Sequence, residues 1–165
     1  MDEKKPIISP TTKRRLIVQG YYCYSDKELN DYKYGIRFAY YSCDLLVILG
    51  LLLTNSWILA VAMTIAFLGW LLPKHPFDYL YNYAIRYMIN KPEIPPRTKQ
   101  VRFACGIAAA WLCGTIILFK YGLDIWGYSA GGLLVSVATL VATTDICIPS
   151  MIYNALFNKQ SDQMK

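Results

Sequence analysis

Four long apolar blocks, separated by polar segments, dominate the pattern of hydrophobic positions along the chain. A bilayer core is about 30 Å thick, so a helix of roughly 17–25 mostly apolar residues crosses it. The second and third blocks are near the short limit, where a buried helix of a soluble protein is the alternative. Four such blocks in one small chain leave no polar shell to cover them, so the pattern predicts an all-α polytopic membrane protein. The predicted spanning helices cover residues 36–53, 57–72, 103–119 and 128–148.

The segments between the blocks predict how the helices are connected. Residues 54–56 separate the first two blocks and residues 120–127 the last two, so each pair is expected to form an antiparallel hairpin. The connection between the hairpins contains Pro92, Pro95 and Pro96, which end any helix there. The resulting domain plan is an N-terminal segment over residues 1–24, a four-helix transmembrane domain over 25–158 and a tail over 159–165.

Two helix starts are marked in the sequence. Ser25 followed by Glu28 matches a capping box, so the first helix is predicted to begin there and to extend beyond the membrane. Pro76 opens a segment over about residues 76–90 whose apolar residues fall on one face. We expect an amphipathic helix in the membrane interface, with packing inside the protein or on a partner as the alternative. His75, the one histidine, is expected to cap this helix.

Charge supports the membrane prediction and adds an orientation. Charged residues make up 17% of the chain, against about 25% in a typical soluble domain. Of the 17 basic residues, all except Lys120 lie before or at the first block, in the central connection or in the tail. Because Lys and Arg favour cytoplasmic loops, both termini and the central connection are predicted to be cytoplasmic. The basic residues are expected to contact anionic lipid headgroups, and no nucleic-acid partner is expected.

Two acidic residues, Asp44 and Asp145, fall inside predicted spanning helices. A charged carboxylate within the bilayer is costly, so such residues usually face the protein interior. The antiparallel order of the helices places both acids at comparable depth, near the cytoplasmic side. The plainer interpretation is that each acid bonds a neighbouring helix or pairs with an arginine, either Arg37 or Arg102.

The end of the fourth predicted helix carries a second candidate feature. Pro149 has no N–H and clashes with the preceding turn, so the carbonyl of Asp145, four residues earlier, loses its helical partner. In lipid that carbonyl needs another donor. We therefore consider an intramembrane polar cluster that pins the fourth helix to the first, with a simple proline kink as the alternative. The proposed cluster contains Asp44, Asp145, Ser150 and Tyr153.

Five cysteines are present, and no two of them form a C-x-x-C pair. Cys147 and Ser150 form a C-x-x-S pattern, which allows a mixed disulfide but no internal one. Cys147 is therefore the candidate reactive thiol, and burial as a small apolar side chain is the alternative. One histidine and no HExxH sequence leave no catalytic set or metal site to propose, and no cofactor is expected.

Small residues recur at four-residue spacing in the last two predicted helices. In lipid, close backbone approach at small residues is a main source of helix association. These faces are expected to pack the third helix on the fourth or on a neighbouring subunit. The residues are Gly106, Ala110, Gly114, Gly127 and Gly131.

Three segments together resemble a known family. They are HPFDYLYN at 75–82, PPRTKQVRFACGIAAAWL at 95–112 and ATTDICIPSMIYN at 142–154. In this order they are similar to a small bacterial four-helix integral membrane family that is classified as a domain of unknown function, over about residues 34–158. The resemblance implies a location in the bacterial cytoplasmic (inner) membrane and no established reaction.

Two functional hypotheses follow from the residues and the resemblance. The first is a non-catalytic membrane subunit or scaffold of a larger inner-membrane complex, because no complete catalytic set is present. The second is a thiol-linked redox or carrier protein, because many family members end in an F-C-x-G-C-like motif. This chain matches the first cysteine of that motif at Cys147 and has Ser150 in place of the second. Small-molecule transport is a third hypothesis, against which stands the small volume that four helices enclose.

Overall fold

The computed structural model describes residues 8–157, and every regular element in this range is a helix. The predicted all-α class is thus confirmed. In chain order the elements are α1 (Pro10–Val18), α2 (Asp26–Leu52), α3 (Ser56–Leu71), α4 (Pro76–Leu80), the π-helical turn η1 (Tyr81–Ile85), α5 (Arg86–Met88), α6 (Lys99–Lys120), α7 (Asp124–Thr144) and α8 (Ile148–Phe157).

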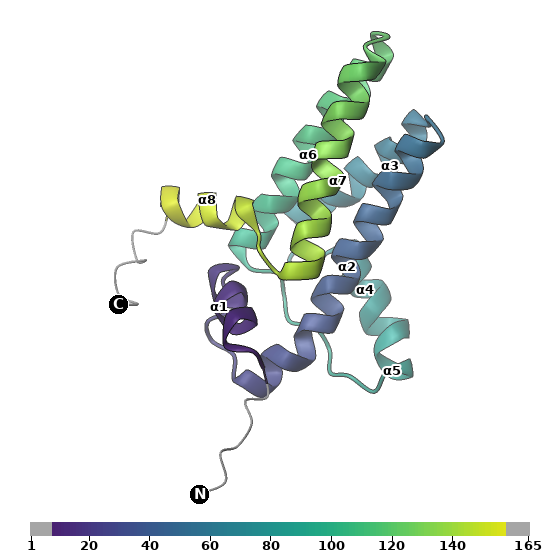
Figure 1. Cartoon of the computed structure of the whole chain (residues 1–165). Coiled ribbons are helices and arrows are strands. Elements are labelled where there is room, and N and C mark those ends of the chain that lie inside the picture. Colours follow the sequence, from purple (N-terminus) through teal and green to yellow (C-terminus); the bar gives the residue numbers. More distant parts are fainter. Residues whose placement is uncertain (1–7, 158–165) are drawn as a thin grey trace, which may run out of the picture.

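The four long helices α2, α3, α6 and α7 form a bundle (Figure 1). α3 packs most extensively on α6, while α2 packs on α3 and α7, and α6 also packs on α7. By length and composition, α2, α6 and α7 are each able to cross a membrane. α3 is long and apolar enough to cross a membrane only when it is counted together with the α4–α5 segment. The two are bent by 85° relative to each other. The described residues therefore contain three candidate spans, or four if the bent pair is one span.

Side-chain caps determine where the main helices begin. The Ser25 hydroxyl accepts from the backbone N–H of Glu28, whose carboxylate accepts from the Ser25 N–H at 2.8 Å, so the predicted capping box forms. The side chains of Asn55 and Thr98 cap α3 and α6 by accepting from backbone N–H groups of the first turn, without a reciprocal bond. At each of these sites an oxygen satisfies N–H groups that the first helical turn leaves without a carbonyl.

The predicted fourth helix is shorter than expected. α7 ends at Thr144, and Asp145 adopts a left-handed backbone conformation with φ 61°. Pro149 then lies in the first turn of the separate helix α8, where its missing N–H costs no hydrogen bond. Figure 1 shows α8 projecting to one side of the bundle, at a steep angle to α7. The chain is therefore broken at this point, and neither a continuous helix to residue 148 nor a simple kink is present.

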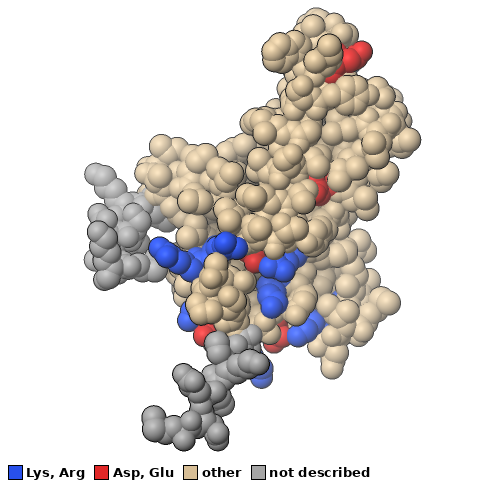
Figure 2. Space-filling model, viewed as in Figure 1, with Lys and Arg blue, Asp and Glu red and all other residues tan. Residues whose placement is uncertain are grey.

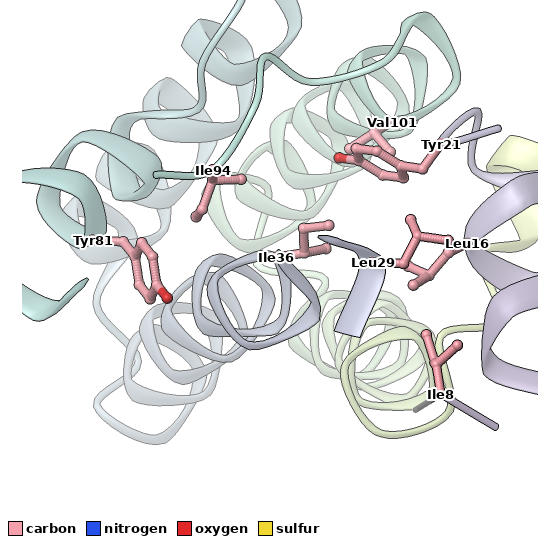
Figure 3. Close-up of a cluster of buried hydrophobic side chains, with 8 residues drawn as sticks. All are labelled: Ile8, Leu16, Tyr21, Leu29, Ile36, Tyr81, Ile94 and Val101. Atoms are coloured by element: carbon pink, nitrogen blue, oxygen red, sulfur yellow. The ribbon is translucent and has the colours of Figure 1, made fainter. Parts of the chain in front are cut away.

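A second core lies below the bundle and includes the helix α1, which the sequence analysis did not predict. Its side chains come from α1 and the residues on either side of it, the start of α2, the connection between α3 and α6, and the start of α6 (Figure 3). We call this region the base and the remainder of α2, α3, α6 and α7 the bundle half. The buried apolar residues of the base are Ile8, Leu16, Tyr21, Leu29, Ile36, Tyr81, Ile94 and Val101.

Candidate functional site

A cavity of about 290 Å³ lies between α2, α6 and α7, and α3 and the start of α8 complete its wall. Small-molecule pockets begin at about 300 Å³, so the cavity suits one small ligand. Its walls are mainly aliphatic, and short alanine side chains at wall positions leave space that larger residues would fill. The alanines of the wall are Ala39, Ala62, Ala66, Ala104, Ala108 and Ala138.

The polar part of the wall is small and includes groups that the sequence analysis treated separately. Apart from the indole of Trp111, it consists of a phenol, an acid, a guanidinium, an imidazole and three thiols. These groups belong to α2, to α6 and to the residues that precede α4, α6 and α8. They are Tyr40, Asp44, Arg97, His75, Cys43, Cys105 and Cys147.

The Arg97 side chain forms a buried ion pair with Asp78. Arg97 Nε donates to Asp78 Oδ2 at 2.6 Å, and Nη2 donates to Oδ1. The side chains of both residues are at most 2% exposed. Burial opposes the charge of Arg97, but the Asp78 carboxylate outweighs this effect and holds the pKa of the guanidinium well above its usual value. The guanidinium carbon also lies 5.5 Å from the centre of the Tyr40 ring, so Arg97 is held from two sides.

His75 caps α4, as expected, and its capping position also directs the ring towards the thiols. Asp78 accepts from the His75 backbone N–H at 2.9 Å, and His75 Nδ1 accepts from the Phe77 backbone N–H at 3.3 Å. His75 Nε2 lies 3.7 Å from Cys43 Sγ. Because α4 begins here with Pro76, local helix-capping chemistry positions a side chain of the cavity wall.

Gly69 of α3 makes room for this ring. A Cβ atom at position 69 would lie 2.3 Å from His75 Cδ2 and 3.3 Å from Cys105 Sγ. Real Cβ atoms do not approach a ring carbon so closely, so glycine is the residue that allows this contact. The same measurement shows that His75 and Cys105 meet at one point of α3. The cavity therefore has a thiol-rich polar end against α3 and α4.

Asp44 lies on the wall farther along α2 and bonds a different helix. Its Oδ2 accepts from Thr139 Oγ1 of α7 at 2.6 Å. Its Oδ1 is buried and makes no hydrogen bond with the described residues. Asp44 thus joins α2 to α7, in line with the plainer interpretation given to it from the sequence.

Asp145 has different partners, so the two acids do not belong to one hydrogen-bonded group. Arg37 Nε donates to Asp145 Oδ1 at 2.9 Å, and Arg37 Nη2 donates to Oδ2 at 2.5 Å. The backbone carbonyl of Asp145 accepts from Gln19 Nε2 at 2.8 Å, and Arg15 donates to the carbonyl of Thr144. The freed carbonyl does find a donor, as predicted, but the donor comes from the loop after α1.

Ser150 and Tyr153, the other members of the proposed polar cluster, make no hydrogen bond with Asp44 or Asp145 among the described residues. Tyr153 packs its ring at 5.4 Å from Phe103 and 5.0 Å from Phe157, which makes it part of an aromatic contact between α6 and α8. Ser150 is fully buried next to Cys147. The structure therefore corrects the cluster of four. Because α7 ends before Asp145, Ser150 and Tyr153 belong to the separate helix α8, and Tyr153 contacts Phe103 of α6.

The cysteines are free thiols, and Cys147 is the most enclosed of the five. It lies in the link between α7 and α8, is 4% exposed and lines the cavity. Burial raises the pKa of its thiol, while the hydroxyl and backbone N–H of Ser150 act in the opposite direction. A buried thiol with a raised pKa is a weak nucleophile. Within residues 8–157 no group of three or more His, Cys, Asp or Glu side chains is arranged to hold a metal ion.

The five small residues that were predicted to pack helices together do not all face the same neighbour. Cβ atoms at Gly106, Gly127 and Gly131 would meet Trp70 of α3, Phe119 of α6 and Leu51 of α2 respectively. Ala110 and Gly114 are exposed, and a Cβ at Gly114 would touch nothing within 4 Å. Only Gly127 therefore packs α7 on α6 as expected, while Gly106 and Gly131 face the first two long helices.

Basic side chains gather at one end of the molecule. Figure 2 shows Lys and Arg over the base, around α1 and the start of α2, while the viewed face of the bundle half is largely uncharged. The polar end of the cavity lies on the side of the base, because Arg97 precedes α6 and His75 precedes α4. The cavity thus extends from the charged end of the molecule into its apolar half.

Sequence reasoning missed Asp78, Arg97 and Gln19. The H-P-x-D pattern at 75–78 is a capping signal that identifies Asp78. Arg97 is 19 residues away from Asp78, and Gln19 is 126 residues away from its partner Asp145, so no local pattern connects them.

Comparison with known proteins places the chain in one family. No curated protein and no solved structure matches it. The family described as Domain of unknown function (DUF4395) matches residues 33–158, which is most of the chain. The chain therefore belongs to the DUF4395 family.

Proposed function

We propose that the chain crosses the bacterial cytoplasmic membrane four times, with both termini and the connection between α3 and α6 on the cytoplasmic side. α3 packs along α2 and α6, so it is expected to share their environment although it is short. The concentration of basic residues around the base supports the orientation. The α4–α5 segment is then placed at the cytoplasmic interface.

Labelling with an impermeant maleimide tests this topology. In a cysteine-free background, a cysteine introduced at Asn55, between α2 and α3, is expected to react from the periplasmic side. A cysteine at Lys99, at the start of α6, is expected to stay unlabelled until the membrane is opened. The reverse pattern would overturn the orientation, and labelling of both from one side would overturn the four spans.

Within this topology we propose a binding role: a non-catalytic membrane subunit that holds a small lipid-soluble molecule in the bundle. The supporting observation is the cavity between α2, α6 and α7, with its aliphatic walls and its few polar groups at one end. Such a combination is typical of small-molecule sites, in which apolar walls bind and a few polar groups orient. The raised pKa of Cys147 favours binding over thiol chemistry.

A matched pair of substitutions on α6 tests the binding role. Ala108→Leu places a larger side chain in the cavity, whereas Ala110→Leu adds the same volume on an exposed face of the same helix. Protein purified from native membranes is extracted, and its bound small molecules are measured by mass spectrometry. We expect one co-purifying species that is lost from Ala108→Leu and retained by Ala110→Leu. Equal amounts in both variants would contradict the proposal.

A thiol-linked role is the second candidate, because Cys43, Cys105 and Cys147 surround one cavity. Brief alkylation of native membranes followed by mass spectrometry separates it from the binding role. If the three thiols serve redox chemistry, at least one of them will be modified as fast as the exposed Cys113. The binding role predicts much slower modification of all three.

A further inference from the structure

We propose that the cavity takes up one acyl chain of an anionic membrane lipid, which enters sideways where α6, α7 and α8 meet. This inference rests on the proposed function, that the chain spans the membrane and that the cavity holds a lipid-soluble molecule. It adds the route into the cavity, the class of molecule and the position of its headgroup.

The cavity is closed towards α2 and α3 and reaches the surface on the opposite side. The residues that α2 and α3 contribute to its wall are all buried or half-buried. Four other wall residues are at least 40% exposed, and each of them belongs to α6, α7 or α8. We call these four residues the mouth of the cavity, and all of them are apolar. They are Trp111, Leu133, Ile148 and Ile152.

α8 turns its apolar face outwards and its polar face towards the protein, the reverse of a surface helix in a soluble protein. On the inner face, Asn154 donates to the carbonyl of Val18 at 2.7 Å and accepts from Gln100 Nε2 at 3.2 Å. The outer residues recur at helical spacing and are all exposed. They are Ile148, Met151, Ile152, Ala155 and Leu156. A continuous exposed apolar face of this kind marks an interaction site.

The outer face of α8 is continuous with the cavity, because Ile148 and Ile152 belong both to that face and to the mouth. Figure 1 shows α8 at a steep angle to α7, so α8 runs roughly along the membrane plane when α7 crosses the membrane. A helix in this position meets the acyl chains of the neighbouring lipids. With about 290 Å³, near the lower limit of small-molecule pockets, the cavity accommodates one such chain and not a whole lipid.

Two cationic side chains beside α8 indicate an anionic headgroup. Arg14 lies one turn before Val18, and Lys99 lies one turn before Phe103; Val18 and Phe103 both contact α8. Arg14 and Lys99 are exposed, and neither forms an ion pair with the described residues. Figure 2 shows basic side chains directly below α8, on the side of the base. Basic residues at this level attract anionic lipids, so the headgroup is placed there while one chain passes over α8.

Photo-crosslinking of the wild-type protein in phosphatidylcholine nanodiscs tests the inference without any variant. Two probes carry the same acyl chain with a diazirine near its end, one on phosphatidylglycerol and one on phosphatidylcholine, at equal low mole fraction. Mass spectrometry then identifies the crosslinked residues. We expect crosslinks at the mouth and at Ala108 and Ala138 inside it, above the level at Val61, an exposed residue of α3 outside the cavity. The phosphatidylglycerol probe is expected to label the cavity about tenfold more than the other probe.

A matched pair of double variants tests the headgroup position. Arg14→Gln with Lys99→Gln is expected to bring the labelling by the two probes to within about twofold of each other. Lys33→Gln with Lys120→Gln removes the same charge elsewhere, because Lys33 lies over the Tyr34 ring and Lys120 ends α6. This control is expected to keep the tenfold difference.

The space inside the cavity is tested with the same probes. Ala108→Leu is expected to remove the labelling of Ala138 and to leave that of Met151, which lies outside the cavity on the apolar face of α8. Ala110→Leu, on an exposed face of α6, is expected to change neither.

The other outcomes separate this inference from the proposed function. Labelling of α8 without labelling inside the cavity would overturn the inference, and the binding role would stand if a co-purifying species is still lost from Ala108→Leu. Equal labelling by the two probes would also overturn it, because the headgroup would then not be selected. An unlabelled α8 would overturn it in favour of a protein partner on that face. Equal labelling of the cavity in Ala108→Leu and Ala110→Leu, with no co-purifying species lost, would overturn both proposals.

Discussion

The base and the bundle half bury their side chains in different ways. In the base, large side chains from α1, α2, α6 and the central connection meet in one core, beside two bidentate Arg–Asp pairs. In the bundle half, a smaller cluster around Leu59 and Leu112 is accompanied by alanines, a cavity and many exposed apolar residues. The base is thus closed by its own contacts, whereas the bundle half has space inside it and apolar side chains on its surface.

The largest expected effect concerns the Arg37–Asp145 pair. Asp145 has a side chain only 2% exposed, so Arg37→Met leaves a buried carboxylate without its partner. We expect a loss of about 3–5 kcal/mol in the free energy of unfolding, measured by denaturant titration in detergent. Adding Asp145→Leu to Arg37→Met is expected to restore part of this loss. If the single and double variants are equally stable, the pair does not hold the base together.

The next prediction compares the truncation of one leucine side chain in the base with one in the bundle half. Leu16 of α1 is fully buried in the base, so Leu16→Ala is expected to cost about 2–5 kcal/mol. Leu133 of α7 is 52% exposed, so Leu133→Ala is expected to change the stability by about 0.5 kcal/mol or less. The same unfolding measurement serves both. Equal losses would remove the distinction between the two regions.

A smaller effect is expected where the two regions meet. Gly69→Ala places a Cβ against the His75 ring, and overpacking of this kind costs about 1–3 kcal/mol. Gly114→Ala is the control, because its Cβ meets open space and alanine favours a helix over glycine by about 1 kcal/mol. Thermal unfolding in detergent should therefore show opposite shifts for the two variants. Shifts of the same sign would contradict the close contact at Gly69.

The smallest effect concerns the start of α2. Ser25→Ala removes the hydroxyl of the capping box and is expected to cost about 1 kcal/mol. Ser25→Asp keeps an oxygen acceptor at the same position and is expected to restore most of the stability. A similar loss in both variants would show that the cap does not stabilise this exposed end of the base.

The sequence contains local signals for some of these features and none for others. The apolar blocks predicted the four long helices, and Ser25 with Glu28 predicted the start of α2, because each signal lies within a few neighbouring residues. The position of His75 as a helix cap followed from Pro76 in the same way. These predictions depend on backbone chemistry alone.

The features that the sequence analysis missed depend on contacts between distant segments. Gln19 reaches the carbonyl of Asp145 across 126 positions, and α1 has no long apolar face to mark it. The end of α7 was predicted four residues late, because the residue that adopts the left-handed conformation there is Asp145 and not a glycine that would mark a helix end. The cavity was also missed, since alanines that line a space and alanines that pack tightly look the same in one sequence.

Because of the π-helical turn η1, the fold is expected to tolerate the loss of one residue better at some positions of the chain than at others. A π-helix closes its hydrogen bonds over one residue more than an α-helix, so η1 already accommodates an extra residue between α4 and α5. Losing one residue there converts the turn to an α-helix and leaves α2, α6 and α7 in register. One residue lost within α6 would instead turn everything after it by about 100°, which moves its alanines away from the cavity. Length variation among relatives is therefore expected within residues 81–85 and not in the helices that line the cavity.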